Sequence, residues 1–201
     1  MNWRTENGTV HENCVVFFKV TEEFGALSNM AGGYPLRVNG IAIFSSEALY
    51  QACRFPHQPE WRREIISQQS PMAAKMKSKK EGRRKHHSRS DWDEIEIRIM
   101  DWVLKVKLAQ HYSQMSRLLR ATGNRPIVEK SRNDRFWDAV EQEDGVLRGR
   151  NQLGQLLMEL RKFVEIMTQE DFAEVQPLSI PDFLLLGKPI EIVRGGHRPQ
   201  R

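Results

Sequence analysis

Hydrophobic residues along this chain follow two spacings, one typical of strands and one typical of helices. Residues 14–20 form an apolar run rich in β-branched and aromatic side chains, which predicts a buried strand. In residues 38–44, two short apolar runs flank Asn39-Gly40, the kind of pair that most strongly favours a tight hairpin turn. A further short apolar segment covers residues 126–129. We therefore expect a small sheet that includes a hairpin.

Helical spacing dominates much of the remaining chain. Ser70-Pro71 places an N-cap before a proline at the first helical position, which predicts a helix to about Lys80. Ser90 is expected to cap a long helix whose apolar stripe runs from Trp92 to about Gln110. A shorter helix is predicted for residues 113–121. The last long helix is expected to carry its apolar face at Leu153, Leu156, Leu157, Leu160 and Val164.

The sequence changes character after residue 173. Residues 184–193 predict two short strands around a Gly187-Lys188-Pro189 turn, and residues from Arg194 onward predict a loose tail. We therefore expect a mostly α-helical α+β fold with a small β-sheet, in which residues 1–173 form one domain. Residues 174–201 are expected to form a C-terminal extension that packs on this domain.

Composition narrows the class of protein further. The chain has 201 residues with a formal net charge of +5, which favours an anionic partner. Its two cysteines, Cys14 and Cys53, are far apart and lack metal-ligand spacing, so they predict reduced thiols in a cytoplasmic protein. His86-His87 has no ligand companions, and no secretion signal or membrane-length apolar run is present. We expect no metal, no cofactor and no membrane association.

Glu47 is the first candidate for chemistry. It follows the predicted hairpin, in a segment where Ser45 or Ser46 can cap a new helix. A carboxylate in the first helical turn is favoured by the helix dipole, so we expect a lowered pKa and an ionised group. Such a group suits a nucleophile, a base or a stabiliser of positive charge, and it is a poor general acid. The structural alternative is an acid that merely stabilises the helix N-terminus.

Two further segments offer ligand-binding groups. Gly149 and Asn151 precede the last long helix, where exposed amides can bind phosphate, although glycine and asparagine are also ordinary capping residues. Residues 131–137 contain Asp134 and end in Trp137, a second carboxylate and a possible stacking platform. The structural alternative is an aspartate in a turn and a tryptophan in the core. Trp92 is open to the same two interpretations.

A dense basic stretch begins within the helix predicted to end near Lys80 and continues to the start of the next one. Residues 75–89 hold eight cations and one acid, Glu81, a density typical of surfaces that contact nucleic acid or other polyanions. A solvated helix face is the alternative. The cations are Lys75, Lys77, Lys79, Lys80, Arg83, Arg84, Lys85 and Arg89.

A series of these segments occurs in order between residues 15 and 162: Phe24–Asn29, Asn39-Gly40, Ser46–Ala52, Asp91-Trp92, Lys105–Gln110, Leu118–Gly123, Ser131–Trp137 and Gly149–Met158. The ordered set resembles the NADAR (YbiA-like) superfamily. That resemblance implies an α+β N-glycosidase that needs no metal and cleaves an N-glycosidic bond to ribose. One branch of the family acts on phosphorylated ribosylamino-pyrimidines of riboflavin synthesis. Another removes ADP-ribose from guanine in DNA and so acts as antitoxin to a DNA ADP-ribosyltransferase.

The resemblance also implies roles for individual residues. Glu47 would be the catalytic carboxylate, assisted by Asp134, with Trp92 and Trp137 around the ribose or its base. Ser28 and Asn29 would line the same pocket. Apart from the resemblance, we expect the helix start at Gly149 and Asn151, with Lys75, to bind the diphosphate of the ligand. The density of positive charge predicts that the surplus cations Arg83, Arg84 and Lys85 hold the DNA backbone. In this sequence Asp138 replaces a usual glycine and Met30 a usual aromatic residue.

The basic helix and the C-terminal extension look more like the ADP-ribosyl-guanine branch, so the expected partners are ADP-ribosylated guanine in DNA, ADP-ribose and a cognate toxin. The riboflavin-pathway N-glycosidase is the first alternative. A binding module for ADP-ribose or nucleic acid without turnover is the second, with Asp138 marking a degenerate site.

Overall fold

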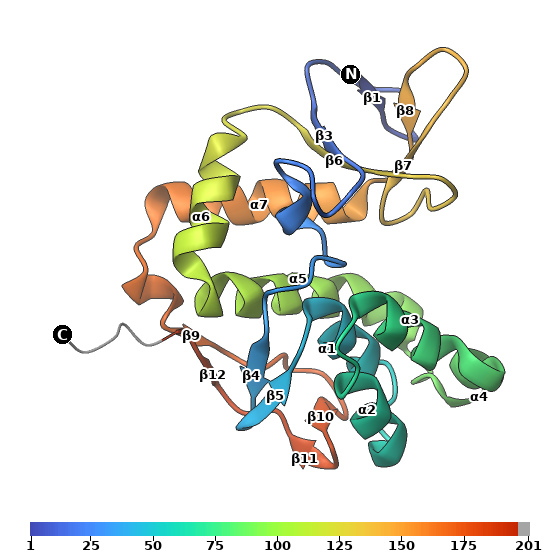
Figure 1. Ribbon diagram of the computed structural model, residues 1–201, viewed down its shortest axis with the longest axis vertical. Helices are drawn as coiled ribbons and strands as arrows, with labels where there is room; N and C mark the ends of the chain where they lie inside the picture. The colour runs from blue at the N-terminus through green and yellow to red at the C-terminus, as the bar shows by residue number, and fades with distance from the viewer. Residues whose placement is uncertain (197–201) are drawn as a thin grey trace. The chain divides into compact units, whose positions relative to one another are not determined.

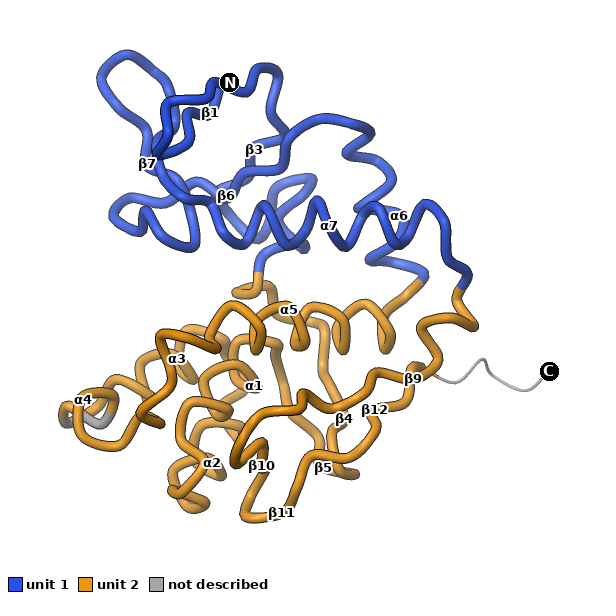
Figure 2. Tube along the Cα trace, turned by 180° about the vertical axis from the view of Figure 1, so that it is seen from behind, with its two compact units in different colours: residues 1–28, 113–168 blue, residues 29–112, 169–201 orange. Residues whose placement is uncertain are grey.

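The computed structural model describes residues 1–196, except for the side chains of Glu81 and Arg83 (Figure 1). The chain packs into two compact units, and each is assembled from two separate stretches of sequence (Figure 2). The first unit contains Met1–Ser28 and Ser113–Thr168, and the second contains Asn29–Tyr112 and Gln169–Arg201. The main chain therefore passes from one unit to the other at Ser28-Asn29, immediately before the predicted site residue Asn29.

The first unit is built on a six-stranded mixed sheet in the order β2-β1-β8-β7-β6-β3. The strands are β1 (Trp3–Arg4), β2 (Val10–His11), β3 (Val15–Phe17), β6 (Ile127–Ser131), β7 (Ala139–Glu141) and β8 (Leu147–Arg148). The strand expected at residues 14–20 is β3, which pairs in parallel with β6, Val15 opposite Ile127. Most of these strands have only two or three residues, so alternation along the sequence could not reveal them.

Two helices complete the first unit, α6 (Tyr112–Ala121) and α7 (Gln152–Ile166), with a short 3-10 helix at Gly25–Leu27. The predicted apolar face of α7 is confirmed, because its leucines and Val164 are buried. The helix lies so close to β6 that a Cβ on Gly154 would be 2.1 Å from the carbonyl oxygen of Ile127. Glycine is therefore required there by contact with the sheet.

The second unit is mainly helical. Its helices are α1 (Ser46–Cys53), α2 (Pro59–Ile66), α3 (Pro71–Lys79), α4 (Arg83–His87) and α5 (Trp92–Gln110), with 3-10 helices at Lys80–Gly82 and Glu170–Phe172. Three two-stranded ladders accompany them: β4 (Leu36–Val38) with β5 (Ile41–Ile43), β9 (Glu174–Val175) with β12 (Val193–Arg194), and β10 (Leu184–Leu185) with β11 (Lys188–Pro189). All eight residues of α1 are buried, which makes it the central helix of this unit.

In the second unit, most of the turns and helix caps predicted from local sequence are found in the structure. The hairpin is confirmed, with Asn39 and Gly40 both at positive φ, as a tight turn between twisted strands requires. Ser45 caps α1, and Ser70 caps α3 with its hydroxyl 3.3 Å from the amide of Ala73. The predicted Ser90 cap is wrong. Asp91 occupies the cap position of α5, and its carboxylate pairs with the Arg89 guanidinium 2.6 Å away instead of capping the helix.

The C-terminal region differs from its prediction in two details. The turn lies at Leu186-Gly187, both at positive φ, so Lys188 and Pro189 belong to the second strand. Arg194 lies in β12 and is not part of a loose tail, whereas residues 197–201 lie outside the described part of the chain. Arg89 donates to the carbonyl oxygen of Pro181 at 2.6 Å, which ties this region to the start of α5. Within residues 1–196, no helix has both the length and the apolar character of a membrane span.

Candidate active site

Glu47 lies in the first turn of α1 with 4% of its surface exposed. Two amides hold its carboxylate. The Asn29 Nδ2 donates to Oε2 at 2.6 Å, and the Gln51 Nε2 donates to Oε1 at 2.8 Å. Ser46 fixes the backbone of Asn29, since its hydroxyl donates to the Asn29 carbonyl oxygen at 3.1 Å. The carboxylate therefore has one defined orientation.

The electrostatic setting of Glu47 differs from the expectation. Burial raises the pKa of the carboxyl group above its usual value, against the lowering effects of the Lys75 ammonium, the two amides and the Arg84 guanidinium. The predicted lowering of this pKa is wrong, because the first-turn position was considered without the loss of water around the side chain. A raised pKa lies closer to neutral pH, so Glu47 is suited to exchange a proton as well as to stabilise charge.

Asn29 offers a second group to a ligand. Its Oδ1 is sealed from solvent and has no hydrogen-bond partner among the residues the structure describes. Buried amide oxygens are rarely left unpaired in folded proteins, and an unpaired one beside a carboxylate can accept a hydrogen bond from a bound molecule. Asn29 can therefore both position Glu47 and bind a donor group such as a ribose hydroxyl.

Behind Glu47, the support of Gln51 extends to the basic stretch. The Gln51 Oε1 accepts from the Ser78 hydroxyl at 2.9 Å and from the Arg84 Nη2 at 2.8 Å. Sequence reasoning missed Gln51, although its position one helical turn after Glu47 places both on one face of α1. It also placed Arg84 on the DNA surface, yet this half-buried side chain is directed at Ser78 and Gln51.

Trp92, the first residue of α5, is 3% exposed. Its ring lies 5.2 Å from the ring of Tyr50, and the Arg54 guanidinium lies 4.6 Å from its centroid. The Tyr50 hydroxyl donates to Glu96 at 3.2 Å, and burial raises the pKa values of both groups. Trp92 thus already has packing partners in the core of its unit, and its stacking on a base stays a prediction.

Five of the predicted site residues belong to the first unit: Ser28, Asp134, Trp137, Gly149 and Asn151. Asp134 uses Oδ1 to accept from the amides of Phe136 and Trp137, each at 2.9 Å, so this carboxylate shapes its own turn. Trp137 is half-buried, with its ring edge-to-face against Phe136 at 5.1 Å. The Ser28 hydroxyl donates to Glu129 at 2.6 Å. The assignment of Ser28, Asp134 and Trp137 to ligand binding stays a prediction.

Gly149 and Asn151 have clear structural roles. A Cβ on Gly149 would be 2.5 Å from the carbonyl oxygen of Asp138, and the Asn151 Nδ2 donates to the Ile127 carbonyl oxygen at 2.8 Å. At the start of α7, the amides of Gln152 and Leu153 donate to the carbonyl oxygens of residues 136 and 137. These two amides of the first helical turn are therefore already used within the unit. Phosphate binding at this helix stays a prediction.

Asp138, in place of the usual glycine, does not strain the fold. It is absent from the non-glycine residues at positive φ, so its backbone has an ordinary conformation that any residue adopts. This substitution alone therefore gives no reason to regard the site as degenerate.

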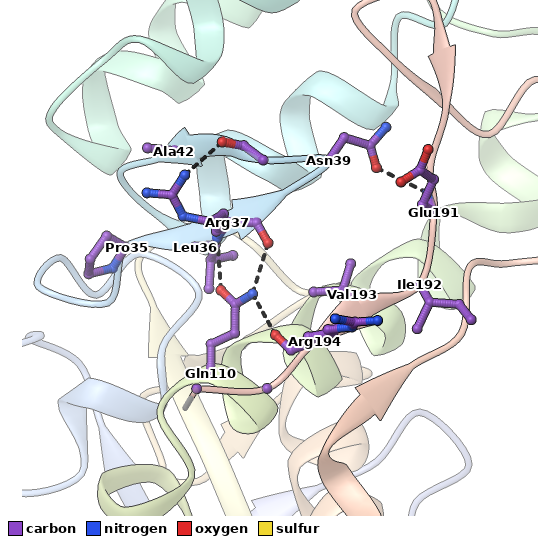
Figure 3. A pocket seen from close by; sticks show the side chains of 13 residues that line it. Pro35, Leu36, Arg37, Asn39, Ala42, Gln110, Glu191, Ile192, Val193 and Arg194 are labelled. Carbon is purple, nitrogen blue, oxygen red and sulfur yellow. Dashed lines mark hydrogen bonds between the residues drawn. The ribbon is translucent and has the colours of Figure 1, made fainter. Parts of the chain in front are cut away.

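A pocket of about 590 Å³ lies elsewhere in the second unit, between the β4–β5 hairpin and residues 191–196 (Figure 3). Gln110 spans it. Its amide pairs with the backbone N–H and C=O of Arg37, each at 2.8 Å, and donates to the carbonyl oxygen of Arg194 at 3.1 Å. The Gln110 side chain thus links the backbones of β4 and β12 through hydrogen bonds. Nothing in the sequence pointed to this pocket, because its walls meet only in the folded unit.

Among the described residues, no group of three or more His, Cys, Asp or Glu side chains could hold a metal ion. Cys14 and Cys53 are buried free thiols, and burial raises the pKa of Cys53 to about 12. A thiol with so high a pKa is a poor nucleophile at neutral pH.

Comparison with known proteins gives the chain its family, since residues 16–165 match the model of the NADAR domain. The chain belongs to the NADAR family. The N-glycosidase YbiA of Escherichia coli is 31% identical over 157 residues, which cover 78% of this chain and 92% of that protein. The NMR structure of E. coli YbiA superposes with a TM-score of 0.63 at 30% identity, covering 79% of this chain and 88% of that one.

A riboflavin biosynthesis protein of Vibrio vulnificus is 27% identical over 177 residues, which cover 87% of this chain but only 43% of that protein. The expected α+β YbiA-like fold and the NADAR family are both confirmed by these comparisons. These relatives of the NADAR chain are named as an N-glycosidase and for riboflavin biosynthesis, and neither name refers to ADP-ribosyl-guanine cleavage.

Proposed function

We propose that this NADAR protein is an N-glycosidase that hydrolyses the bond between a ribose and a base. The observation that carries the proposal is the setting of Glu47. It is a buried carboxylate with a raised pKa, clamped by Asn29 and Gln51 and facing the charge of Lys75. Cleavage at the anomeric carbon passes through an oxocarbenium-like state, which a fixed carboxylate stabilises while it activates the attacking water.

The substrate we propose is ADP-ribose attached to guanine in DNA, which makes the protein an antitoxin to a DNA ADP-ribosyltransferase. Support comes from the net charge of +5 and from a basic surface on the second unit. There, a hollow of about 470 Å³ is lined in part by Lys77, Lys79 and Lys80. A DNA-borne substrate gains from cations along its backbone, whereas a small metabolite does not need them.

One observation favours a second candidate function. The Vibrio vulnificus relative, named for riboflavin biosynthesis, matches 87% of this chain. A ribosylamino-pyrimidine phosphate also presents an N-glycosidic bond to ribose, so the same carboxylate would serve. The two substrates differ in what lies beyond the ribose, and a direct comparison of turnover separates them.

The test is to incubate the purified protein with guanine-ADP-ribosylated DNA and, separately, with a ribosylamino-pyrimidine phosphate. Release of free ADP-ribose with restored guanine supports the DNA substrate. Release of ribose 5-phosphate alone supports the biosynthetic substrate. Binding of modified DNA without any release identifies a non-catalytic module. The Glu47→Gln variant is the control, since it removes the charge while keeping the size of the side chain.

A further inference from the structure

Gln51 is the contact through which Arg84 and Ser78 reach Glu47. An amide side chain has a donor end and an acceptor end, and the two differ in what they meet here. The donor end faces Glu47, with Nε2 at 2.8 Å from Oε1. The acceptor end faces Arg84 and Ser78, whose donor atoms lie 2.8 Å and 2.9 Å from Oε1 of Gln51. The orientation of this one amide decides whether Glu47 meets a donor or an acceptor.

Arg84 leaves the amide only one orientation. A guanidinium has donors and no acceptor, so it can meet the oxygen of Gln51 but not its NH₂ group. Ser78 is held in the same arrangement, because its oxygen accepts from Arg84 Nη2 at 2.7 Å and from Nε at 3.1 Å. A reversed amide would face the guanidinium with its NH₂ group and the Glu47 carboxylate with its oxygen. Only a protonated Glu47 could accept that arrangement.

Arg84 is itself fixed from behind. The Ser88 hydroxyl donates to the Arg84 carbonyl oxygen, and it accepts from the Nε of Arg54 at 2.7 Å. Arg54 lies over the ring of Trp92, so α4 is connected to the start of α5. Arg84 is in this way directed toward the groups that hold the buried carboxylate, while Lys79, Lys80 and Lys85 are exposed.

We propose that Arg84 and Ser78 are positioning residues that fix the orientation of the Gln51 amide and thereby keep Glu47 ionised for hydrolysis. This replaces the DNA-backbone role expected for Arg84, and it rests on the proposed function of Glu47. The other charged or titratable groups that act on Glu47 are Lys75 of α3 and Tyr50 of α1. Neither of them acts through the Gln51 amide.

The experiment measures the pKa of Glu47 directly, by NMR titration of ¹³C-labelled glutamate side chains in the full-length protein without substrate. Arg84→Gln should raise this pKa by about one unit, because a Gln51 amide that is free to reverse no longer holds its donor end against the ionised carboxylate. Arg98→Gln, which removes an exposed arginine of the same unit, should leave it unchanged. Ser78→Ala should raise it by a smaller amount, and Arg84→Lys should restore part of the wild-type value.

A second set of variants, made in a Gln51→Ala protein, distinguishes an effect of Arg84 through the Gln51 amide from a direct attraction between the charges of Arg84 and Glu47. In a Gln51→Ala protein, Arg84→Gln should shift the pKa of Glu47 far less than it does when Gln51 is present. An equal shift in both backgrounds would overturn the proposal in favour of a direct charge effect, and no shift in either would overturn it altogether. If Arg84→Gln does not fold, the same pair of backgrounds is compared with Ser78→Ala.

Activity provides the second readout. The pH dependence of kcat/KM on an ADP-ribosylated guanine nucleotide should move to higher pH in Arg84→Gln by the same amount as the Glu47 pKa. An unchanged profile beside a shifted pKa would overturn the link to hydrolysis. A wild-type protein that hydrolyses no ribose N-glycoside would defeat the proposed function instead, while the NMR comparison would still decide the role of Arg84 in holding the amide.

Discussion

Replacing Glu47 by glutamine should abolish activity without a loss of stability at neutral pH. A carboxylate that transfers a proton or stabilises developing charge contributes about 10²–10⁴-fold to a rate. This corresponds to about 3–5 kcal/mol of transition-state stabilisation. Glutamine keeps the volume of the side chain but neither the charge nor the ability to exchange a proton, so hydrolysis should fall by that factor.

Glu47→Gln should lower activity but should increase the stability of the folded protein, and this gain in stability depends on pH. Folding raises the pKa of Glu47, so the folded protein holds this proton more tightly than the unfolded chain does. Below the unfolded-state pKa the group is protonated in both states, so its ionisation does not change the free energy of unfolding. As the pH rises toward and through the folded-state pKa, ionisation destabilises the native state by about 1.4 kcal/mol for each unit of the shift. Glutamine removes this cost.

The new amide can also be accommodated. Of the two donors that hold the carboxylate, Gln51 can still donate to the amide oxygen. Asn29 can reverse its own amide, because its Oδ1 is unpartnered among the described residues and can then accept from the new NH₂ group. We therefore expect the melting temperature of Glu47→Gln to equal or exceed that of the wild type at pH 8, with the difference shrinking toward pH 4.

The assay pairs thermal melts from pH 4 to pH 8 with single-turnover hydrolysis of whichever of the two proposed substrates the wild-type protein cleaves. Glu94→Gln, an exposed carboxylate of the same unit, is the matched control and should show neither effect. A variant that is less stable than the wild type at pH 8, with the difference growing as pH rises, would refute the reasoning about burial. Activity within tenfold of wild type in a folded variant would refute the catalytic role.

Three further outcomes are expected. Gly154→Ala places a Cβ 2.1 Å from the backbone of β6 and should lower the free energy of unfolding, measured with denaturant, by about 1–3 kcal/mol. The control Gly32→Ala, whose Cβ would have nothing within 4 Å, should be near neutral, and equal stabilities of the two variants would contradict the close packing of α7. Cys53, with a pKa near 12, should resist alkylation at pH 8 until the protein unfolds, and rapid labelling of the native protein, read by mass spectrometry, would argue against its burial. Neutralising the exposed lysines Lys79, Lys80 and Lys85 should lower activity on modified DNA and reduce the slope of log activity against log salt by up to about 3. Activity on an ADP-ribosylated guanine nucleotide should change little, and equal losses on both substrates would place these lysines at the reacting ribose.

Local sequence signals predicted the elements that local interactions determine. The Asn39-Gly40 turn, the Ser45 and Ser70 caps and the buried face of α7 all depend on residues within a few positions of one another. The six-stranded sheet was underestimated, because its strands are short and pair residues from opposite ends of the chain. No periodicity records such pairing.

The candidate site shows the same division. Its carboxylate and part of its support could be found from motif resemblance, but the direction of the Glu47 pKa could not, because burial arises only from packing around α1. A run of like charges likewise does not reveal which of its cations turn inward, and only the hydrogen bonds of Arg84 to Gln51 and Ser78 connect that residue to the site.

The interleaving of the two units has a consequence for synthesis on the ribosome. Strand β3 is synthesised about 110 residues before its parallel partner β6. At roughly 5–20 residues per second, the strand waits several seconds or more with its apolar side chains unpaired. The second unit is completed only when β12 has paired with β9. A nascent chain halted at residue 112 would therefore contain neither unit complete, and premature termination there should yield a product that chaperones and proteases remove.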